Sequence, residues 1–290
     1  APAKPEPNIL EKGPAYGDIR PAASEAAAPG DWPTYRHDAA RSGATSLSVP
    51  AALKPLWAAA PGGKLTPPVV AGGRVLVAGD ATIHALDARD GKPLWQFVAG
   101  GPVDSPPTVH GGRVLFGAHD GWVYCLRGGD GALAWRFRAA PAERRIIAME
   151  QLESPWPVIG SVLVKNGVAY CVAGRSSFLD GGLFLYGLDP ATGEKLHEAR
   201  LDGPWPDLAT DPGRGFYMDG AQPDVLVAGV GESADFIYLR QRKFDASLKE
   251  VPVPYVTGVG ASVGVNYEGK PEKAHTPIDV GQGDKETGLH

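Results

Sequence analysis

A block of about 40 residues that recurs along the chain limits the possible folds more than any other feature. Residues 66–76, TPPVVAGGRVL, recur 39 positions later as SPPTVHGGRVL. The segments 83–86 and 90–95 then recur in the same order as 123–126 and 130–135. Ordered matches at a nearly constant offset indicate tandem copies of one unit, whose apolar faces are buried by stacking on their neighbours.

Each copy predicts four short strands. The Pro-Pro run suits an innermost strand whose start tolerates proline. A Gly-Gly turn leads to a second strand at 74–78, and a third strand at 82–87 alternates with period two. An Asp-Gly turn then leads to a fourth strand that carries Trp95 or Trp135. Tandem four-stranded units of this size are typical of a β-propeller, so the predicted fold is all-β.

Less complete copies flank these two. Residues 166–197 form a looser third copy with His197 at the tryptophan position, set off by insertions at 139–156 and 176–182. A half-copy ends at Trp57, and a further copy is predicted to begin at 224–227 and 236–240. The chain is therefore expected to hold about 3–5 blades of a larger ring.

Composition narrows the class of protein. The 39 Gly and 28 Pro accompany 43% hydrophobic residues and seven Trp, which favours turns between strands over disorder. The net charge of −5 and the lack of a basic run argue against nucleic acid as a partner, and no apolar stretch is long enough to be a transmembrane segment.

Three regions are predicted along the chain. The Pro/Ala-rich residues 1–30, which begin at Ala1, suit an exported tether whose signal peptide has been removed. Export predicts a periplasmic, extracellular or cell-envelope location. Residues 31–250 hold the blades, and residues 251–290 are either a Gly/Pro-rich tail or an incomplete blade.

The turn before each tryptophan resembles the tryptophan-docking motif of pyrroloquinoline-quinone (PQQ) propellers. Residues 85–95 carry it most fully, 188–196 match up to His197, and 125–135 match with Gly128 in place of the aspartate. A docked tryptophan packs between blades and needs a partner for its indole N–H. The predicted structural residues are Trp57, Asp87, Gly91, Trp95, Gly131, Trp135, Asp189 and Gly193.

Residues 31–43, DWPTYRHDAARSG, also resemble the lead-in of PQQ-like propellers, including those related to the outer-membrane lipoprotein of the β-barrel assembly machinery. Catalytic members of the fold imply Ca²⁺ or a lanthanide, an aspartate base and often adjacent cysteines. Cys125 and Cys171 are far apart and are expected to be buried thiols, with a disulfide left open. No catalytic, cofactor-binding or metal-binding residue is predicted.

The insertions are the candidate binding loops, because loops on a rigid scaffold carry function. The first has helix-forming composition, and its arginines could bind an anion or pair with Glu143 and Glu150. Two Trp-Pro sites could stack on a sugar or peptide, or pack beneath a loop. The candidate residues are Arg144, Arg145, Trp156, Arg175, Phe178, Asp180 and Trp205.

The predicted function is a non-catalytic binding or scaffolding propeller of the cell envelope, which binds protein or glycan through the loops of one face. A protein partner or further blades would complete the ring. Two alternatives remain open at this point: a fragment of a PQQ- and Ca²⁺-dependent quinoprotein dehydrogenase, and a carbohydrate-binding or carbohydrate-active propeller.

Overall fold

The computed structural model describes residues 7–19, 30–148, 150–203, 224–240 and 242–252. These residues form four antiparallel sheets and a separate two-stranded hairpin. Three of the sheets have four strands, each from one continuous stretch of chain, and the fourth sheet has four such strands and a fifth strand from the N-terminal segment. The only helical element of the described residues is the 3-10 turn Gly231–Ser233. The prediction of an all-β propeller of four-stranded blades is confirmed.

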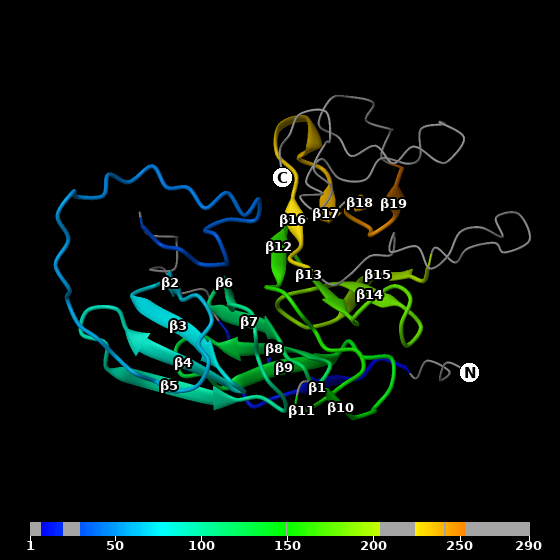
Figure 1. Ribbon diagram of the computed structural model, residues 1–290, viewed down its shortest axis with the longest axis horizontal. Helices are drawn as coiled ribbons and strands as arrows, with labels where there is room; N and C mark the ends of the chain where they lie inside the picture. Colours follow the sequence, from blue (N-terminus) through cyan, green and yellow to red (C-terminus); the bar gives the residue numbers. More distant parts are fainter. Residues whose placement is uncertain (1–6, 20–29, 149, 204–223, 241, 253–290) are drawn as a thin grey trace, which may run out of the picture.

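The blades follow one another around an arc, with the first strand of each on the inside (Figure 1). Blade 1 contains β2 (Val69–Ala71), β3 (Arg74–Gly79), β4 (Thr82–Asp87) and β5 (Pro93–Val98). Blade 2 contains β6 (Thr108–His110), β7 (Arg113–Gly117), β8 (Trp122–Arg127) and β9 (Leu133–Arg138). Blade 3 contains β12 (Leu163–Lys165), β13 (Val168–Ala173), β14 (Leu183–Leu188) and β15 (Lys195–Leu201). Blade 4 contains β16 (Val227–Ala228), β17 (Ile237–Leu239), β18 (Arg242–Phe244) and β19 (Glu250–Val251).

The hydrophobic core lies between neighbouring blades. Alternation along each strand sends successive side chains to opposite faces of the sheet, so both faces of a middle blade are apolar. One buried cluster joins blades 1 and 2 around Phe116 and Tyr124, and a second joins blades 2 and 3 around Trp135. A third cluster joins blades 3 and 4 around Tyr170 and Phe244. Each blade is therefore stabilised by its neighbours.

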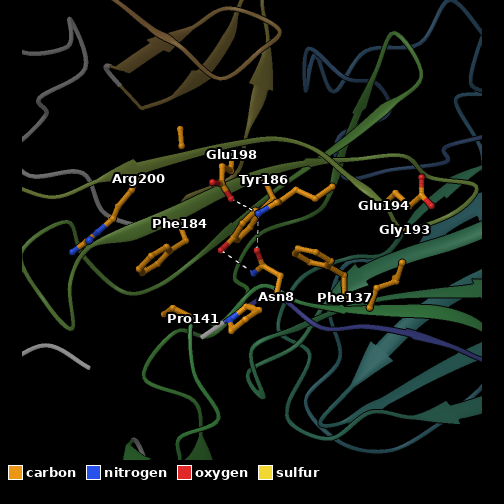
Figure 2. Close-up of a pocket in the computed structure, with 13 residues that line it drawn as sticks. Asn8, Phe137, Pro141, Phe184, Tyr186, Gly193, Glu194, Glu198 and Arg200 are labelled. Atoms are coloured by element: carbon orange, nitrogen blue, oxygen red, sulfur yellow. Dashed lines mark hydrogen bonds and ion pairs between the residues drawn. The ribbon is translucent and has the colours of Figure 1, made fainter. Parts of the chain in front are cut away.

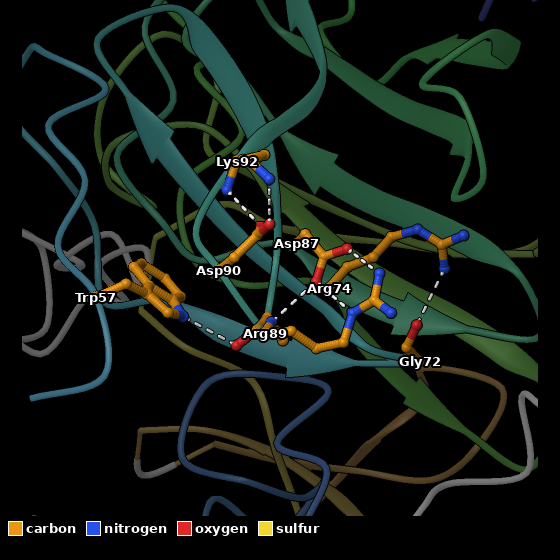
Figure 3. Close-up of polar contacts among 8 residues, drawn as sticks. Trp57, Gly72, Arg74, Asp87, Arg89, Asp90 and Lys92 are labelled. Carbon is orange, nitrogen blue, oxygen red and sulfur yellow. Dashed lines mark hydrogen bonds and ion pairs between the residues drawn. The ribbon is translucent and has the colours of Figure 1, made fainter.

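The three repeat tryptophans each contact the next blade in the same way. The indole N–H groups of Trp57, Trp95 and Trp135 donate to backbone carbonyls at 3.0, 3.0 and 3.2 Å. The acceptors belong to the turns before the fourth strands of blades 1, 2 and 3, at Ala88, Gly128 and Pro190. Figure 3 shows the first of these contacts.

Glycine in the same turns lets the indole ring approach. A Cβ built on Gly91 or Gly131 would lie 2.5 Å from the ring of Trp57 or Trp95, and on Gly193 it would lie 2.6 Å from that of Trp135. All three glycines also have φ between 72 and 74°, where other residues are strained. Both reasons explain why the repeat carries Gly here.

The aspartates of the motif shape the turns. Asp87 accepts from the Arg89 backbone N–H at 2.8 Å and pairs with the Arg89 guanidinium (Figure 3). Asp189 accepts from the backbone N–H groups of Ala191 and Thr192 at 2.7 and 2.9 Å. These side-chain bonds hold the turn that presents the carbonyl to the tryptophan.

The junction between blades 3 and 4 lacks a tryptophan. His197 stands at the tryptophan position and lies against Gly187 of its own blade. The turn carbonyl of blade 4, from Ala246, instead accepts from the Tyr170 hydroxyl at 2.8 Å. Leu248, with φ 65°, occupies the place of the turn glycine. A tyrosine from the second strand thus replaces the indole donor.

An N-terminal strand was not predicted. Within the region expected to be a tether, β1 (Leu10–Lys12) pairs antiparallel with β9 and adds a fifth, outermost strand to blade 2 (Figure 1). Ala15 is buried in the cluster between blades 2 and 3, and Asp18 pairs with Arg127 at 2.7 Å. Residues 8–19 are therefore part of the propeller surface.

The first insertion forms strands where its composition suggested a helix. β10 (Ile146–Ala148) and β11 (Gln151–Glu153) make a two-stranded hairpin. Two consecutive β-branched residues favour a strand, and Glu150 adopts φ 64°, which suits a tight turn. Cys125 and Cys171 are free and buried, and burial raises the pKa of both thiols to about 12.

Candidate functional site

Both insertions reach the same face of the propeller. In each antiparallel blade, the loop between the second and third strands and the loop that leaves for the next blade emerge at the same end. Residues 139–162 connect blade 2 to blade 3, and residues 174–182 connect β13 to β14. The loops 99–107 and 118–121 end at this face as well. We call this surface the loop face.

A chain of four charged side chains ties these loops together. His119 Nδ1 lies 2.5 Å from Glu153 Oε2, and His119 Nε2 lies 2.9 Å from Asp104 Oδ2. The other oxygen of Glu153 accepts from the Arg175 guanidinium. Each residue comes from a different one of the four loops, so the chain crosses the junction between blades 2 and 3. We call these residues the loop-face network.

Both carboxylates favour a protonated His119. Burial alone would lower the pKa of His119, but the hydrogen bonds and charges of Asp104 and Glu153 outweigh it and raise this pKa above its ordinary value of 6.5. Burial opposes ionisation of Asp104, yet His119 and Ser105 hold its pKa below the usual range. With His119 protonated, both ring nitrogens donate to a carboxylate and charges of opposite sign alternate along the network.

The structure separates the predicted loop residues into two groups. Arg175 joins the network, whereas Trp156 is only 3% exposed and its indole donates to the Asp180 carbonyl at 2.9 Å. Trp156 therefore packs beneath a loop, the second of the two roles considered for it. The Asp180 side chain is exposed and Phe178 is half-buried.

The remaining candidates are peripheral or undescribed. Arg144 is exposed at the base of the β10–β11 hairpin, and Arg145 lies 3.9 Å from Glu143, the pairing considered as the alternative to an anion site. Trp205 lies outside the described residues. Sequence reasoning missed Asp104, His119 and Glu153, since each lies in a separate loop with no motif spacing.

The inner edges of the blades are bound by residues 31–41. Trp32 forms a bridge with Val70 of blade 1, the Pro33 carbonyl accepts from Val109 of blade 2, and that of Ala39 accepts from Ala228 of blade 4. Arg41 is buried among these edges, and burial lowers its pKa to about 10. Its guanidinium donates at 2.6–3.4 Å to Thr34 Oγ1 and to the carbonyls of Tyr35, Ser161, Val162 and Leu226.

A cavity of about 450 Å³ lies beside this segment and is the candidate site for a quinone and Ca²⁺. Its carboxylates are Asp31 and Asp38, and Asp38 already accepts from the Ser42 backbone and hydroxyl at 3.0 and 2.5 Å. Ca²⁺ prefers six to eight oxygen ligands, and the charge of Arg41 would repel it. This donor set does not fit such a site.

A wider groove, of about 890 Å³, lies on the outside between blades 2 and 3 (Figure 2). Its aromatic lining residues Phe137, Phe184 and Tyr186 are themselves buried. Asn8 donates to the Tyr186 hydroxyl at 3.2 Å and accepts from Lys195 at 2.9 Å. Asn8, Tyr186 and Lys195 thus hold the N-terminal segment to blade 3, and the loop face remains the better candidate site.

The described residues contain no group of three or more His, Cys, Asp or Glu side chains placed to hold a metal ion. No helix among them has the length and apolar character that a bilayer crossing needs.

The stacked four-stranded blades and their tryptophan contacts define the chain as a β-propeller of the PQQ type. A family model described as "Outer membrane protein assembly factor BamB" matches residues 48–205, more than half of the chain. The chain belongs to this family, which confirms the resemblance seen in the sequence.

Individual relatives match about half of the chain or less. BamB of Yersinia pestis is 38% identical over 189 residues, 51% of this chain and 46% of that protein. A 1-butanol dehydrogenase (quinone) of Thauera butanivorans is 27% identical over 160 residues, 45% of this chain and 25% of that protein. The chain thus spans about a quarter to a half of the length of the curated relatives it matches.

A solved structure supports the fold. The quinohemoprotein alcohol dehydrogenase from Comamonas testosteroni superposes with a TM-score of 0.52 at 16% identity, over 86% of this chain and 52% of that protein. At this identity the likeness speaks for the propeller architecture alone.

Proposed function

We propose that this chain is a non-catalytic scaffold of the cell envelope that binds a protein partner through its loop face. The observation that carries the proposal is the convergence of both insertions on one face around the loop-face network. A network of paired charges, with Glu153 buried at its centre and Asp104 exposed at its end, fixes the loops to one another, and a fixed loop surface suits recognition of a partner. The family of assembly factors to which the chain belongs supports an envelope role.

Completion of the ring is part of this proposal. Trp57 docks on blade 1 as Trp95 and Trp135 do on blades 2 and 3, yet in the described residues it lies in no strand. It therefore stands where the fourth strand of a preceding blade would lie. Further blades, or a partner polypeptide, would supply the rest of that blade.

The test compares the loop face with the opposite one. A photo-crosslinking amino acid replaces Asp180 on the loop face in one variant and Arg89, exposed in a turn at the other end of blade 1, in a second. Each variant is expressed in its native host, irradiated in intact cells and analysed by mass spectrometry. We expect a specific protein adduct from position 180 and none from position 89. Adducts from position 89 alone, or from neither position, would contradict the proposal.

A quinoprotein dehydrogenase is the second candidate, because a quinone-dependent butanol dehydrogenase is among the relatives. Its support is weaker, since the inner-edge cavity does not offer the carboxylates that Ca²⁺ needs. Thermal denaturation with PQQ and CaCl₂ tests it: a rise in melting temperature that needs both additives would favour the enzyme. Binding of glycan has less support still, because Trp156 is buried.

A further inference from the structure

The outer strands of the blades differ in how their free edges are protected. The fourth strand of a propeller blade has one edge paired with the third strand and one edge open. An open edge exposes unpaired backbone N–H and C=O groups, which another chain can pair with unless charge, proline or a covering segment prevents it. Blades 1, 2 and 3 each have a full-length fourth strand, and they treat this edge in three ways.

Blade 2 covers its edge. β1 pairs along β9 in the register Leu10↔Phe137, Glu11↔Arg136 and Lys12↔Trp135. The Glu11 carboxylate also pairs with the Arg136 guanidinium. The outer edge of β9 is thus occupied by the chain's own N-terminal segment.

Blade 3 protects its edge with charge. β15 has the sequence KLHEARL, and its central residue is Glu198. Full-length pairing of two β15 strands about a twofold axis at the strand centre would place one Glu198 opposite the other, which like-charge repulsion disfavours. Lys195 and Arg200 add further charge to the same strand.

Blade 1 has neither protection. β5 has the sequence PLWQFV and lies at the end of its sheet, with no strand on its outer side among the described residues. Leu94 and Val98 are 47% and 66% exposed. Pro93 is only the first residue of the strand. In the following five residues, the backbone N–H and C=O groups that do not bond to β4 alternate toward the open edge.

Alignment of the fourth strands of blades 1, 2 and 3 shows which positions differ in charge. Trp95, Trp135 and His197 occupy the same position opposite the third strand of their blades. Counting from them, Gln96 corresponds to Arg136 and Glu198, and Val98 corresponds to Arg138 and Arg200. Both positions are charged in blades 2 and 3 and uncharged in blade 1.

We propose that β5 is a dimerisation edge, where the strand pairs antiparallel with β5 of a second copy of this chain. A strand without charge meets itself without repulsion, and a twofold axis makes the contact self-complementary. Blades 1 of the two copies then form one continuous sheet of eight strands. Trp95 and Phe97 stay packed toward blade 2, because edge pairing uses only the backbone and the exposed side chains.

The test measures the mass of the full chain by sedimentation velocity across a concentration series. The wild-type chain is expected to dimerise reversibly. Val98→Arg gives blade 1 the arginine that blades 2 and 3 have at this position, and it is expected to weaken the dimer at least tenfold. Val230→Arg is the matched control, because Val230 in blade 4 is 67% exposed, and it is expected to leave the dimer unchanged.

A second control separates the edge from the neighbouring sheet face. His84, on β4, is the cross-strand partner of Gln96 and lies one strand inside the edge. His84→Glu should leave an edge dimer intact, and amide hydrogen exchange in residues 94–98 should slow as the wild-type dimer forms. A monomeric wild-type chain at all concentrations, or a dimer that Val98→Arg does not weaken, would overturn the proposal. Loss of the dimer in His84→Glu without slowed exchange in β5 would overturn it too.

Discussion

The two junctions of blade 3, with blade 2 and with blade 4, use different side chains to donate a hydrogen bond to the turn carbonyl of the following blade. On the blade 2 side, the Trp135 indole lies on Gly193 and donates to the Pro190 carbonyl at 3.2 Å. On the blade 4 side, the Tyr170 hydroxyl donates to the Ala246 carbonyl at 2.8 Å. The acceptor is the same position of the same turn in both cases.

The comparison shows what a blade junction requires. The turn carbonyl of the next blade needs a donor, and apolar volume must fill the space beside it. Trp135 supplies both from the fourth strand. In the other junction the two roles are divided, because Tyr170 donates and Leu248 stands where the turn glycine would be. The repeat motif is therefore one solution among others for stacking blades.

Removal of Trp135 should have the largest effect. Trp135→Ala leaves a cavity between blades 2 and 3 and a carbonyl without its donor, so we expect a loss of about 3–5 kcal/mol in the free energy of unfolding. Trp57→Ala should cost less, about 1–2 kcal/mol, because Trp57 is half-buried and in no strand. Urea denaturation measures both values. Equal losses of unfolding free energy in the two variants would contradict the expectation that the more deeply buried tryptophan stabilises its blade junction more.

Gly193→Ala tests the close approach of the ring. The new Cβ would lie 2.6 Å from Trp135 at φ 74°, so we expect a loss of about 2–3 kcal/mol in stability. Gly167→Ala is the matched control in the same blade, since φ is 77° there and no atom lies within 4 Å of the new Cβ. It should cost only the backbone strain, about 1 kcal/mol. The difference in urea denaturation isolates the docking contact, and no difference would refute it.

Tyr170→Phe tests whether tyrosine replaces the indole donor. Loss of the hydroxyl leaves the Ala246 carbonyl without this bond, and we expect a loss of about 1 kcal/mol in stability. Tyr186→Phe is the control, since Tyr186 is also a buried residue of blade 3 and its hydroxyl accepts from Asn8 of the N-terminal segment, not from blade 4. Thermal and urea denaturation compare them. A Tyr170→Phe chain as stable as the wild type would show that apolar packing alone holds blade 4.

The smallest effect is a pH dependence that belongs to the junction of blades 2 and 3. The pKa of His119 is raised by Asp104 and Glu153, so its stabilisation is full below pH 6.5 and is lost as pH rises through the raised pKa. Urea denaturation between pH 5.5 and 8.5 should show this loss in the wild type and not in His119→Gln. Glu153 keeps its bond to Arg175 throughout, which limits the effect. An identical pH profile in the two chains would contradict the role of His119.

The blades were predictable because their signals are local. The Asp-Gly turns, the alternating strands and the docking glycines recur within one block, and each acts on its near neighbours in sequence. The same locality explains the wrong expectation for the first insertion. Its charged and alanine-rich flanks favour a helix, but the pair Ile146 and Ile147 and the turn at Glu150 produce a hairpin.

The contacts that could not be predicted from the sequence are long-range. Arg41 donates to carbonyls 120 or more positions away in blades 3 and 4, and any buried carbonyl would do, so no residue type marks the partner. The loop-face network joins four loops whose approach depends on the assembled blades. Tyr170 replaces a tryptophan from a different strand, which a comparison of aligned copies cannot reveal.

The fifth strand of blade 2 has a consequence for the order in which the molecule assembles. Glu11 meets Arg136 across 125 positions of chain, and closing a loop of that length costs about 4 kcal/mol of chain entropy. Each blade, by contrast, folds from adjacent hairpins. β1 should therefore join a blade that has already formed, be the last strand to become protected during refolding, and be the first to open under mild denaturant.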